Sequence, residues 1–408
     1  MTTAPNESPD PRAAPGAVPV LLLLVFLSLI GFGVVIPLLP FFATAFDAPP
    51  WQVALLFATY SAGQFLGELF WGRLSDRIGR RPVLLITIIG SAVGYVALAF
   101  SPGIWTAVLV RGAAGFFSGN MSAIQGYIVD VSPPHKLAGR LGLIGSAFGV
   151  GFVVGPALGG LLAQPELGAA GFRPPLLVAA GLCVLATVGI LIFVKESRRP
   201  GGAAARARNP LAALGEALRH PILSRAFGVI FFGFFASSAL WSTLGLWLDD
   251  RFAWGPREVG LLMALTGVAS ALAQGGLAGL SVRRLGATPT IITGLLVAAI
   301  CYASMAIAPE AWIGAAFLLA GVVGHALWQP AATAIVSRAT DPDRQGAILG
   351  AASASGSLAR VIGPTLAGAL FSGIGSWAPL VFAGVFMLPA AWLGWRAGHA
   401  LRTARART

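Results

Sequence analysis

Four ionisable residues interrupt long apolar runs of this 408-residue chain: Glu68, Arg111, His325 and Arg360. Ionisable side chains inside a bilayer are costly, so those that occur are candidates for function. Glu68 is the only acid well inside such a run. Removal from water favours the neutral form of a carboxyl group, so Glu68 could bind and release a proton near neutral pH. The alternatives are contact with a substrate or a structural role as the partner of an arginine such as Arg360.

Several polar residues share a helical face with these candidates. Gln64 lies one turn from Glu68, and Trp328 and Gln329 lie one turn from His325. The spacing predicts that His325 lines a pocket and titrates near its ordinary value of about pH 6.5, although a structural histidine is an equal alternative. Arg360 is about 14 residues, or roughly 21 Å, into its run, so it should face the protein interior or water rather than reach the membrane surface.

The elements that carry these residues are predicted membrane helices. The chain is 56% hydrophobic and 10% charged, whereas soluble domains carry about 25% charged residues. About 20 apolar residues are needed for a helix to cross a bilayer, and barrel strands are only about ten residues long. The twelve predicted spans are 18–43, 53–72, 82–100, 104–129, 138–163, 174–194, 224–248, 258–281, 289–308, 311–336, 346–371 and 377–396.

The net charge of +12 reflects membrane orientation rather than nucleic-acid binding. Of the 27 Lys and Arg residues, only Arg173, Arg251 and Arg257 lie in the odd-numbered loops and only Arg111 and Arg360 lie well inside spans. All others lie in the even-numbered loops, in the termini or at the span ends that adjoin them. Because cytoplasmic loops carry the basic excess, we expect both termini to be cytoplasmic.

The longest hydrophilic stretch divides the twelve spans into two sets of six. It is rich in Ala, Gly, Pro and Arg, and it cannot bury enough apolar surface to fold alone. We expect a cytoplasmic linker at 195–223 between six-helix bundles at 18–194 and 224–396. An N-terminal tail at 1–17 and a basic tail at 397–408 complete the chain.

The loop after the second span combines glycines with an acid and several arginines. The glycines permit a tight turn, and Asp76 can pair with neighbouring arginines in a way that a conformational change could make or break. A weaker copy, residues 279–286, follows the eighth span. The positions of interest are Gly72, Asp76, Arg77, Gly79, Arg80 and Arg81.

This loop resembles the G-x-L-[AGS]-D-R-x-G-R-[RK] motif of the major facilitator superfamily. The resemblance implies a gating role between inward-open and outward-open states; the alternative is that the arginines only orient the protein. Asp130, which ends the fourth span, is expected to join Asp76 in one cytoplasmic charge latch.

The fifth span resembles the glycine motif of the exporter branch of that superfamily, with every position filled. Glycines at near-helical spacing let another helix approach closely, and a proline bends the span. Ordinary small-residue packing is the alternative. The positions are Gly142, Gly151, Gly155, Pro156, Gly159 and Gly160.

Residues 31–40, 77–85, 126–130 and 343–346 extend the resemblance to twelve-span drug/proton antiporters, and most closely to tetracycline exporters. Arg111 matches the arginine of the family pattern in span four, which implies a role in proton uptake. Snorkelling to the outer interface is the alternative.

The sequence departs from the tetracycline exporters at three positions. The acids that those exporters place in spans one and three fall at Ser28 and Gly94, and their histidine in span eight falls at Ser270. The substrate, tetracycline-like or multidrug, is therefore left open.

The resemblance implies an all-α membrane protein with two pseudo-symmetric six-helix bundles and a central substrate cavity. The expected protein is not an enzyme but a monomeric inner-membrane exporter of small amphipathic compounds. Its energy source would be a proton gradient, since no ATP-binding loop is present. The expected cavity residues are Gln64, Phe116, Asn120, Trp241, His325, Trp328, Gln329 and Arg360.

Two alternatives remain. One is an uptake symporter or facilitator for a small metabolite on the same fold. The other is a membrane enzyme or sensor, which would need a catalytic set of residues or a soluble domain that the sequence lacks.

Overall fold

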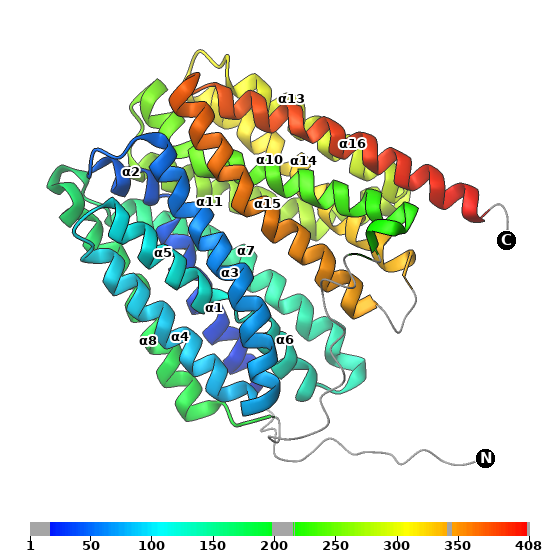
Figure 1. Ribbon diagram of the computed structural model, residues 1–408, viewed down its shortest axis with the longest axis horizontal. Helices are drawn as coiled ribbons and strands as arrows, with labels where there is room; N and C mark the ends of the chain where they lie inside the picture. The colour runs from blue at the N-terminus through cyan, green and yellow to red at the C-terminus, as the bar shows by residue number, and fades with distance from the viewer. Residues whose placement is uncertain (1–16, 198–214, 216, 341–344, 406–408) are drawn as a thin grey trace.

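The computed structural model describes residues 17–197, 215, 217–340 and 345–405, in which the chain forms helices and no strands. Two helical bundles lie side by side (Figure 1). Most of the predicted linker, 195–223, and residues 1–16 of the predicted N-terminal tail lie outside the described residues. The last helix continues to Arg405, into the predicted C-terminal tail.

Each of the twelve predicted spans corresponds to one helix or to one interrupted helix. Among the described residues, nine helices are long and apolar enough to cross a membrane. The N-terminal bundle contains α1 (Ala17–Val35), α2 (Leu39–Thr44), α3 (Pro50–Ile78), α4 (Arg80–Ala99), α5 (Ile104–Ser118), α6 (Met121–Asp130), α7 (Pro134–Leu162), η1 (Pro165–Phe172) and α8 (Arg173–Phe193). The C-terminal bundle contains α10 (Pro221–Phe252), α11 (Pro256–Leu272), η2 (Ala273–Leu277), α12 (Ala278–Leu285), α13 (Ala287–Met305), α14 (Ala311–Arg338), α15 (Gln345–Gly373) and α16 (Ala378–Arg405).

Three spans that we predicted as single helices are interrupted. The first breaks between α1 and α2 around Pro37, which has no amide hydrogen to continue the helical bonding. The fourth breaks between α5 and α6 at Gly119 and Asn120. The eighth contains a π-helical turn, η2, that includes Gly275 and Gly276. Residues with weak helix preference therefore mark each interruption.

The motif after the second span is mostly helical rather than a loop. α3 runs to Ile78, and the turn consists of Gly79 alone, with φ of 105° and ψ of 161°. Gly286 makes the same turn between α12 and α13, with φ of 90° and ψ of 163°. A positive φ of this kind favours glycine, so the two equivalent turns explain the weak sequence repeat between the halves.

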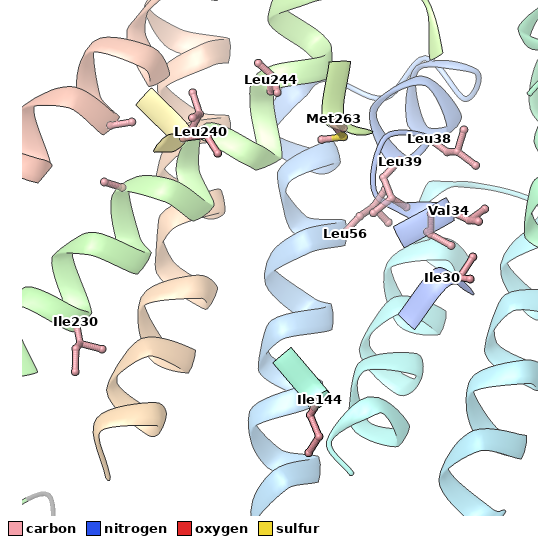
Figure 2. Packing of buried hydrophobic residues seen from close by; sticks show 14 of the residues in the cluster. Ile30, Val34, Leu38, Leu39, Leu56, Ile144, Ile230, Leu240, Leu244 and Met263 are labelled. Carbon is pink, nitrogen blue, oxygen red and sulfur yellow. The ribbon is translucent and has the colours of Figure 1, made fainter. Parts of the chain in front are cut away.

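Apolar side chains from both bundles form one buried cluster. Leu56 of α3, Leu244 of α10 and Met263 of α11 belong to it (Figure 2). In a bilayer, burial of apolar surface does not by itself draw helices together, because lipid tails are equally apolar. Helix association must then depend on close packing of small residues.

Glycines supply that close packing along α7. A Cβ atom on Gly155 would lie 2.6 Å from the Cα of Gly33 in α1, and one on Gly159 would lie 2.3 Å from the carbonyl oxygen of Val34. Any side chain at these positions would push α1 and α7 apart.

The two bundles meet at one end and separate toward the other. A Cβ on Gly160 of α7 would lie 2.4 Å from the carbonyl oxygen of Pro256, whereas one on Gly149 would lie 3.8 Å from Ala271. Farther along α7, a Cβ on Gly145 or Gly142 would meet nothing within 4 Å. The two bundles therefore diverge at the end where α1 begins and α16 finishes (Figure 1).

The substitution Gly155→Ala should lower the thermal stability of the purified protein. The added methyl group has no space beside Gly33, and overpacking of this kind costs about 1–3 kcal/mol. Gly181→Ala on α8 is the matched control, because a Cβ there meets nothing within 4 Å. Thermal unfolding in detergent measures both variants. Equal midpoints for the two would contradict the close contact of α1 and α7.

Candidate functional site

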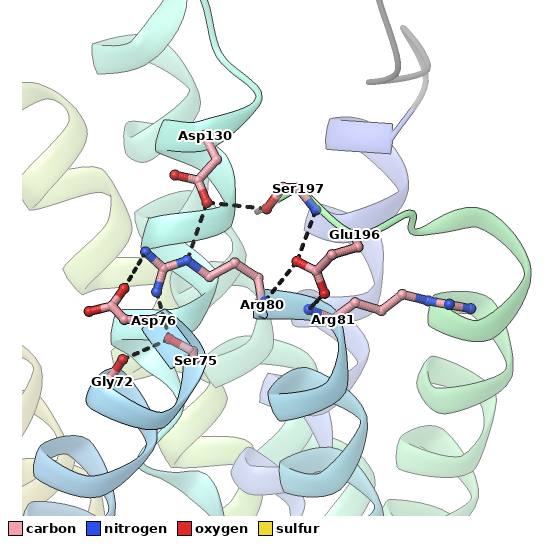
Figure 3. A network of polar contacts seen from close by, with 8 residues as sticks. All are labelled: Gly72, Ser75, Asp76, Arg80, Arg81, Asp130, Glu196 and Ser197. Carbon is pink, nitrogen blue, oxygen red and sulfur yellow. Dashed lines mark hydrogen bonds and ion pairs between the residues drawn. The ribbon is translucent and has the colours of Figure 1, made fainter. Parts of the chain in front are cut away.

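Arg80, the first residue of α4, is the centre of a charge network at the end of α3 (Figure 3). Its Nη2 lies 2.9 Å from Asp76 Oδ1, its Nε donates to Asp130 Oδ2 at 3.2 Å, and its Nη1 donates to Ser75 Oγ at 2.5 Å. Gly126 makes room for the guanidinium, since a Cβ there would lie 2.5 Å from Cζ of Arg80. The planar fork of arginine suits this set of acceptors, which a lysine could not satisfy equally.

Glu196, after the end of α8, extends this network. Its carboxylate accepts hydrogen bonds from the backbone amides of Arg80 at 2.8 Å and Arg81 at 3.1 Å. These amides belong to the start of α4, where unpaired N–H groups and the helix dipole favour a negative group. Ser197 Oγ also donates to Asp130 Oδ2 at 3.2 Å. The segment after α8 is thereby tied to α4 and α6.

The structure brings Asp76, Arg80 and Asp130 together, and all three lie in the N-terminal bundle. Arg81 Nη2 donates to the carbonyl oxygen of Leu191 at 2.7 Å. The carbonyl oxygen of Gly72 accepts from the hydroxyl of Ser75, and Arg77 is exposed.

Glu196 belongs to this network although no sequence motif includes it. Its position just after the sixth span, opposite a basic turn, was the available signal.

Glu68 and Arg360 approach each other from opposite bundles. Glu68 lies on α3 and Arg360 on α15, and these two helices pack against each other across the bundle interface. Arg360 Nη2 donates to Ser357 Oγ at 2.9 Å, and its Cζ lies 5.0 Å from the centre of the Phe234 ring. A guanidinium over an aromatic face is attracted to it, so Arg360 is held beside the bundle interface.

Arg111 is buried within the N-terminal bundle, with 2% of its surface exposed. Its Cζ lies 4.1 Å from the centre of the Tyr60 ring, and its Nε donates to the carbonyl oxygen of Leu56 at 3.4 Å. Its Nη1 has no hydrogen-bond partner within the described part of the chain. An arginine packed in this way does not snorkel to the membrane surface, so that alternative is excluded.

The exporter glycines of α7 divide between two neighbouring helices. Gly151, Gly155 and Gly159 face α1, whereas Gly160 faces α11 of the other bundle. The carbonyl oxygen of Pro156 also approaches α11, since a Cβ on Gly260 would lie 2.4 Å from it. Gly142 lies in open space where the bundles separate. One helix therefore contacts both its own bundle and the opposite bundle.

A cavity of about 90 Å³ lies inside the N-terminal bundle, and its lining includes Gln64 and Asn120. Asn120 Nδ2 donates to Thr87 Oγ1 at 2.8 Å. Pockets for drug-sized ligands have volumes of about 300–1,000 Å³, so this cavity alone does not hold such a ligand in this conformation.

Phe116 lies outside this cavity and packs on Trp71, whose ring centre is 5.3 Å away. The Nε1 of Trp71 also donates to the carbonyl oxygen of Phe116 at 2.7 Å.

The prediction that Trp328 lines a substrate cavity is wrong for this conformation. Its side chain is fully buried, its ring centre lies 5.5 Å from that of Phe234, and it occupies the space beside Gly233. Trp328 Nε1 donates to Nδ1 of His325 at 3.0 Å, so the expected pairing on one helix face does form. Gln329 is exposed. Trp241, the remaining predicted cavity residue, is half-buried on α10.

The positions that were matched to two acids and one histidine of the tetracycline exporters are occupied differently here. Ser28 lines the N-terminal cavity and donates to the carbonyl oxygen of Leu24 at 3.1 Å. A Cβ on Gly94 would lie 3.0 Å from that of Ala114, which leaves little space for a carboxylate. Ser270 accepts a hydrogen bond from Gln274 Nε2 at 2.9 Å.

Replacement of Arg80 should destabilise the N-terminal bundle. In Arg80→Gln, Asp76 and Asp130 would lose their shared cation, and charged hydrogen bonds are each worth about 1.5–3 kcal/mol. Arg77→Gln removes the same charge from an exposed neighbour and is the matched control. Thermal unfolding should give a clearly lower midpoint for Arg80→Gln only. A similar midpoint for both variants would show that the network does not hold α3, α4 and α6 together.

Comparison with known proteins agrees with this architecture. The family model of the Major Facilitator Superfamily matches residues 21–364 and 226–407. The human organic anion transporter MFSD10 (TETRAN) superposes with a TM-score of 0.69 at 24% identity, over 93% of this chain and 98% of that chain. A bacterial homolog of the human lysosomal transporter Spinster, in an inward-facing and occupied conformation, gives a TM-score of 0.75 at 17% identity, over 94% and 96% of the two chains.

Curated relatives share more of the sequence. The class C tetracycline resistance protein of Escherichia coli is 33% identical over 358 residues, which are 85% of this chain and 88% of the relative. Multidrug resistance protein 2 of Bacillus subtilis (strain 168) is 25% identical over 383 residues, which are 90% and 92% of the two chains. The family resemblance that the motifs indicated is thus confirmed: this chain is a membrane transporter that belongs to the Major Facilitator Superfamily.

Proposed function

We propose that this transporter exports small amphipathic compounds in exchange for protons, by alternating access between two bundles. The observation that carries the proposal is the α7 interface, where Gly151, Gly155 and Gly159 of the exporter glycine pattern contact α1 and Gly160 contacts α11. The names of the relatives support export, since resistance proteins for tetracycline and for multiple drugs match most of the chain. Uptake of a small metabolite, the alternative on the same fold, has no comparable support.

Glu68 is the proposed proton carrier, and Arg360 is its partner across the bundle interface. While Glu68 is ionised, its attraction for Arg360 favours the approach of α3 and α15. Protonation of Glu68 removes that attraction, so proton binding would bias the relative positions of the bundles. Arg111 and His325 stay candidates for modulating proton uptake.

Coupling at Glu68 also accounts for the departures from the tetracycline exporters. Neither Ser28 nor Gly94 has an acidic side chain that could exchange a proton near neutral pH, so the acids of that subgroup have no counterpart at these positions. The substrate class is amphipathic in this proposal because the apolar helices α3 and α15, which pack across the bundle interface, carry the ionisable residues Glu68 and Arg360.

The Arg80 network is proposed to hold the gating end of the N-terminal bundle as one rigid unit, with Arg77 and Gly79 at its edge. The diverging end of the bundles carries the basic even-numbered loops, so we assign it to the cytoplasm of an inner membrane. A proton gradient, rather than ATP, supplies the energy, and the protein acts as a monomer.

Addition of tetracycline to energised everted vesicles that contain the protein should release protons, and Glu68→Gln should abolish that release. The amide keeps the shape of the side chain but cannot exchange a proton. Fluorescence of a pH-sensitive dye measures the release. Glu166→Gln, at an exposed acid of η1, is the matched control and should leave the release unchanged.

Different outcomes of this experiment separate the parts of the proposal. No release from the unmodified protein would remove tetracycline as a substrate and lead to tests of other amphipathic drugs. Release that persists in Glu68→Gln would exclude Glu68 as the carrier. Substrate-driven proton entry in the opposite sense would favour uptake.

Glu68→Gln and Arg360→Gln should not have additive effects on transport rate. If their charges act on each other, the first substitution already removes the interaction that the second would remove. Because Glu68→Gln should abolish proton-coupled transport, the rate is measured as substrate counterflow, which needs no net proton movement, in the two single variants and the double variant. If the fold reduction in rate of the double variant equals the product of the two single reductions, the two residues act independently.

A further inference from the structure

A basic crevice lies between the start of α10 and the end of α16, away from the interface of the two bundles. Its volume is about 490 Å³, and its lining includes His220, Arg225, Arg396, His399 and Thr403. None of its eight lining residues is acidic. Several basic groups gathered without an acid among them favour an anionic ligand.

The arginines of this crevice are arranged as hydrogen-bond donors. Arg225 Nη1 donates to the carbonyl oxygen of Arg396 at 3.1 Å, which uses one of the five N–H groups of the guanidinium. The Cζ of Arg396 lies 5.1 Å from the centre of the Trp392 ring, so its side chain is held over that ring. Arginine forks of this kind match the oxygens of a phosphate group.

The position of the crevice along α16 identifies the source of the phosphate. Val385, Leu388, Trp392 and Trp395 are exposed at a spacing of three and four residues, which places them on one lipid-facing stripe. Tryptophan is enriched where the hydrocarbon ends and the headgroups begin. His399 follows on the same face, with its ring centre 6.0 Å from that of Trp395.

We propose that the basic crevice binds the phosphate of an anionic phospholipid in the leaflet on the side of the chain termini. The acyl chains would lie along the exposed stripe of α16 while the phosphate contacts Arg225 and Arg396. A bound headgroup would join the start of α10 to the end of α16. This site is independent of the proposed proton and substrate pathway.

Titration of the purified protein in neutral detergent with phosphatidylglycerol tests the proposal, with thermal stabilisation as the readout and native mass spectrometry to count bound lipids. Each basic residue near a membrane surface contributes about 1 kcal/mol to anionic lipid binding, or about fivefold in affinity. The double variant Arg225→Gln/Arg396→Gln should therefore need roughly 25-fold more lipid for half-saturation. Arg283→Gln/Arg284→Gln removes the same charge from α12, outside the crevice, and should bind as the unmodified protein does.

Arg396→Gln alone provides a milder variant in case loss of the Arg225 contact impairs folding, and it should weaken binding by about fivefold. Equal binding by the crevice variants and the unmodified protein would overturn the proposal. Equal stabilisation by phosphatidylcholine would contradict the proposal, because it would show that the site does not require a lipid with net negative charge. If millimolar inorganic phosphate competes with the lipid and stabilises the protein equally, the crevice binds free phosphate instead.

Discussion

Close contact between helix backbones at glycine is the constraint on which the arrangement of the two bundles depends. In lipid, apolar side chains gain little by leaving one apolar surrounding for another, so helices associate where small residues let them approach. α7 uses Gly155 against α1 and Gly160 against α11. The same helix thus fixes its own bundle and sets the contact with the other bundle. Because this contact opens toward Gly142, the bundles can be closed at one end and separated at the other.

Two kinds of charge interaction are built on this frame, and they differ in what they connect. Arg80, Asp76 and Asp130 join helices of a single bundle, and Glu196 adds the segment after α8. Such a network favours movement of the bundle as one body. Glu68 and Arg360 instead belong to different bundles, so their distance depends on the relative position of the bundles. An interaction of the second kind can link protonation to conformational change.

The packing of the helices explains why this chain differs from the tetracycline exporters at several positions. A carboxylate at Gly94 would be crowded by Ala114, and Ser28 is bonded to its own helix. Arg111 remains in the interior because Tyr60 provides an aromatic face for its charge. The fold of a family can therefore stay the same while its ionisable residues occupy different positions.

The sequence by itself determined the features that depend on local physics. The lengths of the apolar runs specify the twelve spans, and the need for a positive φ specifies glycine at Gly79 and Gly286. Only the tertiary structure decided which side chains face one another. It buried Trp328 beside Gly233 and placed Glu196 at the start of α4. These contacts join residues on different helices, and their geometry depends on how the helices pack rather than on any local pattern.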